Sequence, residues 1–351
     1  MNGLYQVIYF TIVDIFNTLL SPFFIAIFLI IYYQYYKIGR LEEKVRGRRR
    51  APLVKTMEST FFGALGGLIA TVSFIYLEVV VVPKDFMYIL IIAIILSMIN
   101  PRFMCFSYGG SIISFISIVF SFPRIEIKQV MIVVAVLHIV ESILILVQGD
   151  KGNLPVYFED RHEVIGGFNM NRFWPLPFVI FIGGGLIQPV TLMAILSYSD
   201  FTVSASPRNK TVLTSVVLLM YSLILLILAR AAQRQWIAPV FALLGHEFII
   251  LSNSYMEKKR PKVFNNPLKG LRVLEVIPHG IANKAGIKSG DIILRINGID
   301  IMEEKDLRDI ETLNIKITEL SYFSIKKGLT VKRYKGNEKA LGLVIVPRAL
   351  S

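Results

Sequence analysis

His246 and Glu247 are the residues whose types and order most directly suggest catalysis, and they lie in the apolar segment 235–255. Zinc peptidases use the pattern H-E-x-x-H on a helix, where two imidazoles hold the metal and the glutamate acts as general base. In this sequence the second histidine position is occupied by Ile250. The chain has four histidines, and no other segment offers a pair at helical spacing. We therefore expect no catalytic residue, no metal site and no cofactor.

Motifs for nucleophilic catalysis and for phosphate binding do not occur in the sequence, which has no G-x-S-x-G and no P-loop. Ionisable side chains inside apolar segments are still candidates for function, because charges are costly in a membrane. Glu78 lies near the end of one such segment, and His138 and Glu141 share one face of a helix. They could serve a proton relay, or they could hold helices together. A transporter is thus an alternative, although we find no internal repeat of the transporter kind.

The composition indicates a membrane protein with a soluble tail. Of 351 residues, 54% are hydrophobic and 18% are charged, and the long apolar runs all precede residue 256. The single cysteine, Cys105, lies in an apolar run, so no intramolecular disulfide can form. The formal net charge is +13. In a membrane protein such an excess collects at the cytoplasmic face, and we do not expect nucleic acid as a partner.

The hydrophobic runs predict a polytopic α-helical membrane domain of about seven spans, since each helix requires about 20 apolar residues. The predicted spans are residues 19–36, 61–82, 86–99, 103–122, 130–147, 173–196 and 211–229. Residues 4–17 are also apolar and could form an eighth span, an interfacial helix or an extension of the first span. No signal-peptide pattern is evident, so we expect the first span to stay attached. The glycine run 183–185 suggests close helix packing rather than a pore.

Basic residues predict how the chain is oriented. The loop 37–55 is rich in lysine and arginine, and the positive-inside rule places it and the C-terminal domain in the cytoplasm. A further crossing by residues 235–255 would move the C-terminal domain outside. Because the positive-inside pattern would then fail, and because the segment is interrupted by Pro239, Gly245, His246 and Glu247, we interpret it as an in-plane amphipathic or buried segment on the inner face. The loop residues expected to face anionic lipid are Arg46, Arg48, Arg49 and Arg50.

From residue 267 the pattern changes to short alternating runs, which indicate a small α+β domain. A helix is expected at 303–313, where Leu307, Ile310 and Leu313 share one face, and Asn297-Gly298 predicts a hairpin turn. Strands are expected at residues 271–277, 292–296, 320–326, 329–334 and 341–346.

The stretch VLEVIPHGIANKAGIKSGDIILRINGIDI, residues 273–301, resembles the PDZ family over its whole signature. The resemblance implies that a peptide adds to a sheet edge as an extra strand, beside a helix. It implies a groove between strand 271–274 and helix 303–313, with Lys269-Gly270 near a ligand carboxylate. The usual carboxylate loop is shortened, so an internal segment or the protein's own loop could fill the groove instead. The implied peptide-binding residues are Gly270, Leu271, Arg272, Val273, Leu274, Leu307, Ile310 and Glu311.

Spans followed by one PDZ domain, together with the segments PVFALLGHEFII and LGLVIVP, resemble the MinJ-like family of cell-division topological determinants of Gram-positive bacteria. The resemblance implies a multi-pass protein of the bacterial plasma membrane that bridges a DivIVA-like polar scaffold and a MinD-type ATPase, and so limits septum placement. We expect a non-catalytic scaffold that recruits protein partners through its PDZ-like domain. The alternatives are a transporter, or a relative of PDZ-containing intramembrane peptidases that lacks a complete H-E-x-x-H. The expected parts are 1–232 (transmembrane), 233–262 (in-plane segment and linker) and 263–351 (PDZ-like domain).

Overall fold

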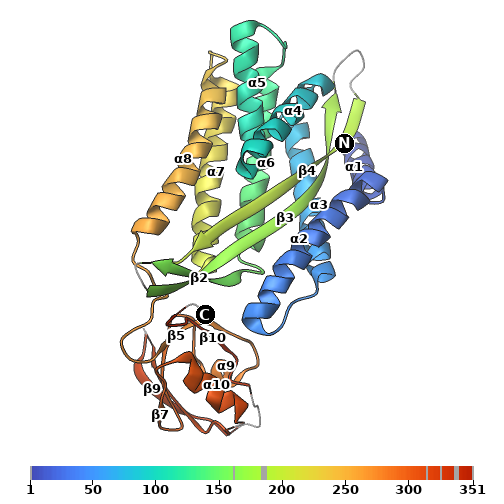
Figure 1. Ribbon diagram of the computed structural model, residues 1–351. Coiled ribbons are helices and arrows are strands. Elements are labelled where there is room, and N and C mark those ends of the chain that lie inside the picture. Colours follow the sequence, from blue (N-terminus) through green and yellow to red (C-terminus); the bar gives the residue numbers. More distant parts are fainter. Residues whose placement is uncertain are drawn as a thin grey trace.

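The computed structural model describes residues 2–160, 163–182, 188–313, 315–324, 326–335 and 340–349. A helical domain with a long β-hairpin forms the larger part, and a small mixed domain lies at one end of it (Figure 1). The helices of the larger part are α1 (Asn2–Leu19), α2 (Pro22–Arg46), α3 (Pro52–Tyr76), α4 (Pro83–Ile99), the 3-10 helix η1 (Pro101–Met104), α5 (Phe106–Phe120), α6 (Ile127–Gln148), α7 (Pro207–Ala231) and α8 (Ile237–Lys259). Its strands are β1 (Val80–Val81), β2 (Leu154–Asp160), β3 (Glu163–Ile182) and β4 (Gln188–Thr202).

Helix boundaries follow local signals in the sequence. Ser21 caps α2 by accepting a hydrogen bond from the Phe24 N–H at 3.2 Å, and Pro22 occupies the first turn, where no N–H partner is needed. Gly47 ends α2 in the left-handed conformation, with φ of 65°. Ser206 and Pro207 begin α7 in the same way as Ser21 and Pro22 begin α2.

Five helices of the described chain are long and apolar enough to cross a membrane: α2, α3, α6, α7 and α8. This count corrects the expectation of about seven helical spans. The predicted spans 86–99 and 103–122 correspond to α4, with 17 residues, and α5, with 15 residues. Both are short, and η1 and Cys105 separate them. A membrane-spanning helix requires about 20 residues, so neither α4 nor α5 is long enough to count as a candidate span.

The predicted span 173–196 is wrong, because these residues form strands β3 and β4 rather than a helix. The strands pair in register from Phe168↔Thr202 to Ile182↔Gln188 and run diagonally across the helices (Figure 1). Pro175 and Pro177 explain the error. Proline breaks a helix but is tolerated in a strand whose N–H side has no neighbouring strand. The glycine run 183–185 lies outside the described residues.

Between its pairings with β2 and β1, the edge of β3 that faces helix α3 has no partner strand, and its N–H groups are satisfied in other ways. Pro175 and Pro177 have no N–H to satisfy. The N–H of Val179 donates to Thr71 Oγ1 at 2.9 Å, and the N–H of Phe173 donates to Tyr35 Oη at 3.2 Å. Along this edge, residues 173, 175, 177 and 179 therefore either donate their N–H to a side chain or have no N–H. A sheet edge in an apolar environment requires every N–H to be bonded or absent, because an unpaired N–H there costs roughly several kcal/mol.

Residues 235–255, expected as an in-plane or buried segment, lie in α8, a helix of 23 residues that packs beside α5 and α7 and is long and apolar enough to be a candidate span. Its length is about 34 Å at about 1.5 Å per residue. Pro239 lies in the first turn, where proline is tolerated. Gly245 lets α8 approach Tyr221, whose ring would lie 3.0 Å from an added Cβ. Pro239 therefore belongs to the start of the helix, and Gly245 allows a close contact, so neither residue interrupts α8.

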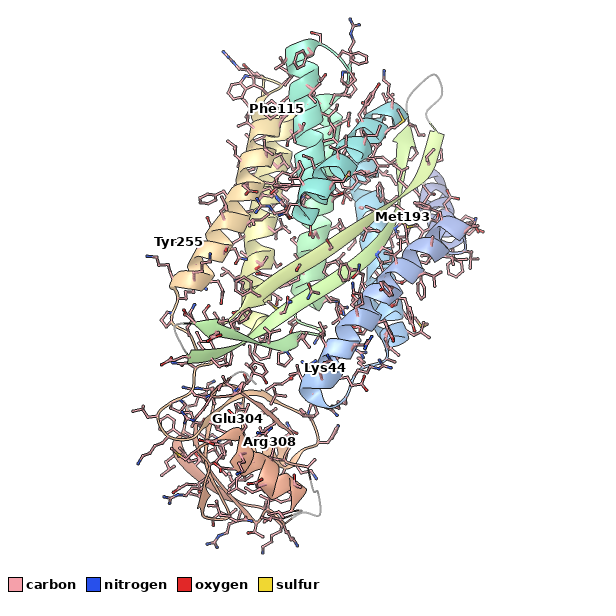
Figure 2. All side chains as sticks on the ribbon, in the orientation of Figure 1. Lys44, Phe115, Met193, Tyr255, Glu304 and Arg308 are labelled. Carbon is pink, nitrogen blue, oxygen red and sulfur yellow. The ribbon has the colours of Figure 1, made fainter. Side chains whose placement is uncertain are left out.

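The two corrections cancel in the topology. Residues 173–182 and 188–196 supply no helical crossing, and α8 is a candidate crossing that was not expected. The loop between α2 and α3 and the C-terminal domain consequently lie at the same end of the helices, as the charge pattern predicted (Figure 1). Figure 2 shows Lys44 at the end of α2 that faces this domain. The turn between α7 and α8, with Arg230 and Arg234, lies at the opposite end, contrary to expectation.

The C-terminal domain contains β5 (Leu271–Val276), α9 (Ile281–Ala285), β6 (Ile292–Ile296), β7 (Ile299–Asp300), α10 (Glu304–Thr312), β8 (Glu319–Ser324), β9 (Gly328–Arg333) and β10 (Leu343–Ile345). The expected strands and helix are therefore present, with ends shifted by up to a few residues. The sheet order is β10-β5-β6-β8-β9, with β7 paired to β6. Residues of β5, β6, β8, α9 and α10 form one apolar core.

The small domain is attached to the larger one by both apolar and charged contacts. Val344 on β10, Val346 just after β10 and Leu274 on β5 share an apolar cluster with Val164 and Phe168 of β3. Arg46, near the end of α2, holds Glu275 by two hydrogen bonds of 2.7 and 2.9 Å. One face of the β5–β10 pair therefore packs on the helical domain, while the opposite face covers the core of the small domain.

Candidate functional site

The predicted groove strand 271–274 corresponds to β5, and both of its edges are already paired. Along one edge β10 pairs from Leu343↔Val276 to Ile345↔Val273, and the Val346 N–H donates to Arg272 O at 2.9 Å. Along the other edge β6 pairs at Leu271↔Ile293. The side chains of Leu271, Val273 and Leu274 are fully buried. An added peptide strand therefore has no place beside β5.

Gly270 and Arg272 have structural contacts in this arrangement. Gly270 has a positive φ of 84°, and an added Cβ would lie 2.4 Å from Ile293 O, so its role is a close approach to β6. The Arg272 guanidinium donates to Gly290 O at 2.7 Å and to Asn265 O at 3.0 Å. Burial lowers the pKa of this guanidinium, while the neighbouring Asp291 carboxylate opposes the shift. Arg272 thus ties the start of β5 to the loops on either side.

The end strand β10 offers the alternative edge among the described strands. It runs alongside α10, because Leu341 at its start shares a core with Leu307 and Ile310, whereas Arg348 beyond its end contacts the start of α10. The Arg348 N–H donates to the Glu304 carboxylate, and its Nε donates to Met302 O at 2.6 Å. Glu304 and Arg308 mark α10 in Figure 2. The predicted helix side of the groove thus contacts the segments just before and just after β10.

The side chains around this edge are suited to an apolar ligand residue. Leu307 and Ile310 are buried at 7% and 4% exposure, and Leu343 and Ile345 of β10 are half-buried against the same core. The backbone of Glu311 lies in α10, while its side chain lies outside the described part of the chain. Tyr157 of β2 donates its hydroxyl to Ile345 O at 3.0 Å, so the helical domain reaches the end strand itself.

The four basic loop residues divide into two groups. Arg48, Arg49 and Arg50 are exposed between α2 and α3. The Arg46 side chain, in contrast, is only 11% exposed, and it also donates to Glu42 at 2.7 Å and to Asn153 O at 2.6 Å. It is therefore a contact between the two domains and not a lipid-facing charge. Charge alone did not distinguish it from its neighbours in the sequence.

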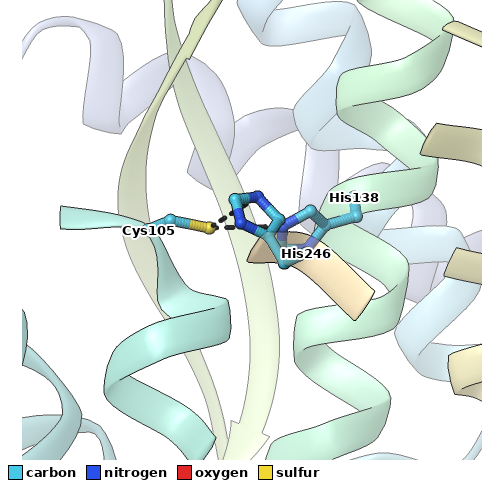
Figure 3. A group of neighbouring side chains, drawn as sticks. All are labelled: Cys105, His138 and His246. Atoms are coloured by element: carbon cyan, nitrogen blue, oxygen red, sulfur yellow. Dashed lines mark hydrogen bonds between the residues drawn. The ribbon is translucent and has the colours of Figure 1, made fainter. Parts of the chain in front are cut away.

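A cluster that the sequence did not predict lies among α5, α6 and α8. Cys105, His138 and His246 point toward one another there (Figure 3), with all three ligand atoms within 4.8 Å. Glu141 lines the same cavity, whereas Glu78 is exposed beyond the end of α3. A search for ligands one turn apart on a single helix could not find this group, because its members come from three separate segments. The one available signal was that all three are polar residues in apolar runs.

Comparisons with known proteins agree with the sequence resemblances. A family model described as a PDZ domain matches residues 272–310. The chain is also similar to the cell division topological determinant MinJ of Bacillus subtilis (strain 168), with 23% identity over 182 residues, which cover 50% of this chain and 45% of MinJ. The match thus spans less than half of that relative's length. No solved structure matches the chain. Both expected resemblances are confirmed: a PDZ domain near the C-terminus, and a distant relationship to MinJ over half of the chain.

Proposed function

We propose that this chain is a non-catalytic membrane scaffold that recruits a partner protein through its PDZ domain. The observation that carries the proposal is the end strand β10, which lies beside α10 at an edge with no further strand among the described residues. PDZ domains bind an extended peptide at such an edge, where main-chain hydrogen bonds supply affinity and side-chain pockets supply specificity. Leu307, Ile310, Leu343 and Ile345 would form the apolar pocket.

The groove proposed here differs from the one expected from the sequence. The strand side moves from 271–274 to 343–345, while Leu307 and Ile310 of the helix side are retained. Gly342, just before β10, has a φ of 72° and an added Cβ there would lie 2.8 Å from Gly280. The segment Leu341-Gly342-Leu343-Val344 therefore makes the sharp entry into the groove strand, and it takes the place near a ligand carboxylate that the expectation had given to Lys269-Gly270.

The finer role that we propose is division-site placement at a bacterial plasma membrane. The support is the similarity to MinJ, whose name describes a topological determinant of cell division. In that role the PDZ domain faces the cytoplasm and the protein bridges a MinD-type ATPase and a DivIVA-like polar scaffold. The exposed residues Arg48, Arg49 and Arg50 would hold anionic lipid at the same face, with each basic residue contributing about 1 kcal/mol.

A crosslinking pull-down from membranes tests the recruitment. The full chain is compared with a chain that lacks residues 267–351, and with two matched substitutions at the two ends of the same sheet. Ile345→Lys changes the proposed groove strand β10, and Val331→Lys changes β9, where the side chain is 53% exposed. We expect capture to be lost on deletion, reduced at least about tenfold by Ile345→Lys, and unchanged by Val331→Lys.

A partner set that is the same with and without residues 267–351 would contradict recruitment through the PDZ domain. Equal loss of capture in both lysine variants would contradict the placement of the groove at β10. Comparing the two variants by protease resistance of the folded domain separates lost binding from lost folding.

A further inference from the structure

Cys105, His138 and His246 are spaced as the ligands of a single metal ion (Figure 3). Cys105 Sγ lies 3.2 Å from His138 Nε2 and 3.7 Å from His246 Nε2. Around a tetrahedral zinc ion, with a Zn–S bond of about 2.3 Å and Zn–N bonds of about 2.05 Å, neighbouring ligand atoms are roughly 3.3–3.6 Å apart. The group therefore fits one ion after small side-chain rotations.

The orientation of the His138 ring is set by a backbone carbonyl. His138 Nδ1 lies 2.7 Å from Val134 O, and because a carbonyl can only accept, Nδ1 carries the hydrogen. The lone pair is then on Nε2, which points at Cys105. Metal-bound histidines usually have this partner on their second nitrogen, since it fixes the tautomer. His246 Nδ1 is buried without a partner in the described part of the chain, so no protein group there imposes the opposite tautomer.

Contacts around the cluster hold its three segments together. Ser107 Oγ and Tyr221 Oη donate to Ala242 O at 2.7 and 2.8 Å, which joins α5 and α7 to α8 one turn before His246. Tyr108 donates to Glu247 at 2.5 Å, and Arg102 binds the other oxygen of that carboxylate at 2.9 Å. Glu247 is therefore engaged with the start of α5 and is not a free base beside His246.

A cavity adjoins the cluster. It has a volume of about 870 Å³, and Cys105, His138, His246 and Glu141 all line it. Asp200, on β4, contributes a further carboxylate to its wall. Structural zinc sites have four protein ligands, whereas sites with three protein ligands keep one position for water or another exchangeable ligand. The cavity is located where such a ligand would enter.

We propose that Cys105, His138 and His246 bind one Zn²⁺ ion whose fourth coordination position opens to this cavity. One thiolate and two imidazoles at near-tetrahedral spacing suit zinc, whereas magnesium and calcium prefer oxygen ligands. The Glu141 carboxylate, three residues after His138 on α6, is available to a zinc-bound water. This site is independent of the PDZ groove, because the three ligands lie in the helical domain.

The site is tested on the full chain, purified in detergent without a histidine tag. Metal analysis should find about one zinc per chain, and chelator-treated protein should take up one equivalent again. Because Cys105 is the single cysteine, its reaction with a maleimide reports on the site directly. We expect zinc to protect Cys105 from the reagent, and cobalt in place of zinc to give the thiolate-to-cobalt absorption band.

Substitutions distinguish the proposed zinc ligands from a histidine outside the cluster. Cys105→Ser and His138→Ala should weaken zinc binding by at least about 100-fold, since even partners outside the ligand set contribute 10–100-fold. His279→Ala, an exposed residue of the small domain, should leave it unchanged. Unprotected Cys105 in the presence of excess zinc would overturn the proposal, and this readout needs no variant. Zinc content that is equal in all variants, or a different metal at one equivalent, would overturn it as well.

Discussion

The carbonyl oxygen of Pro177 lies against the α carbon of Gly67, and an added Cβ at Gly67 would lie only 1.8 Å from it. Four residues earlier, Gly63 has the same relationship to Pro175 O, with a Cβ distance of 2.0 Å. Four residues of helix rise about 6 Å and two residues of strand about 6.6 Å, so the two periodicities match over these contacts. Helix α3 and strand β3 thus pack backbone to backbone, and Thr71 continues the series by binding Val179.

Replacing Gly67 by alanine should destabilise the helical domain, because a methyl group cannot fit against a backbone carbonyl. The cost should be at least about 1–3 kcal/mol, as for other overpacked sites. Gly39→Ala is the matched control, since a Cβ there would meet its nearest atom at an ordinary 3.7 Å. Thermal unfolding in detergent, followed by the fluorescence of buried Trp174 on β3, measures the difference. Equal midpoints for the two variants would show that α3 and β3 are not packed this closely.

The ion pair between Arg46 and Glu275 should control how firmly the PDZ domain is attached. The two side chains are 11% and 25% exposed, so Arg46→Met leaves Glu275 with little access to water. The expected cost is about 3 kcal/mol, the lower end for breaking a buried pair. It should appear as faster proteolysis of the linker after Lys259. Arg295→Met, in an exposed pair with Asp300, is the control and should have no effect on the linker.

The pair formed by Lys210 and Glu257 should be needed for the folding of the region where the start of α7 lies against the end of α8. Both side chains are only 2% exposed and their charged atoms are 2.8 Å apart. Glu257 also accepts the N–H groups of Val203 and Ser204, at 2.7 and 2.8 Å. Glu257→Gln should cost about 3 kcal/mol, because it leaves buried Lys210 with only the longer contact of 3.9 Å to Asp200. A Lys210→Met, Glu257→Gln double variant should recover part of that loss, and no recovery would show that Asp200 alone compensates the Lys210 charge.

The stability of α10 should depend on pH through Asp306. The Asp306 carboxylate accepts the N–H groups of Glu303 and Met302, which lower its pKa below the usual value. Because the folded pKa is depressed, the stabilisation is present above the unfolded value of about 4 and is lost as pH falls through the folded value. The protection factors of the α10 amides, which compare the intrinsic with the observed exchange rate at each pH, should therefore fall in acid in the natural chain. Asp306→Asn should remove that dependence, and an unchanged pH profile would contradict the capping role.

Most of the small domain could be predicted from the sequence, because its information is local. The turn at Asn297-Gly298, the strand at 292–296 and the apolar face of Leu307 and Ile310 each follow from residues close together in the chain. The groove could not be assigned in the same way. Which strand has the open edge depends on the pairing of β5 with β10, which lies about 70 residues later in the chain. Neither segment's sequence alone predicts which strand it pairs with.

The sequence by itself determined that the chain has an apolar helical part, a basic loop on the side of the C-terminal domain, and a PDZ domain at the end. These are properties of composition and short-range pattern, which hydrophobic burial and charge act on directly. Only the tertiary structure decided that residues 173–182 and 188–196 lie in two paired strands and that α8 is a further candidate span. The tertiary structure also brought Cys105, His138 and His246 together. The apolar sequence around each of these residues predicts that the residue is buried, but it does not predict which segments pack against it.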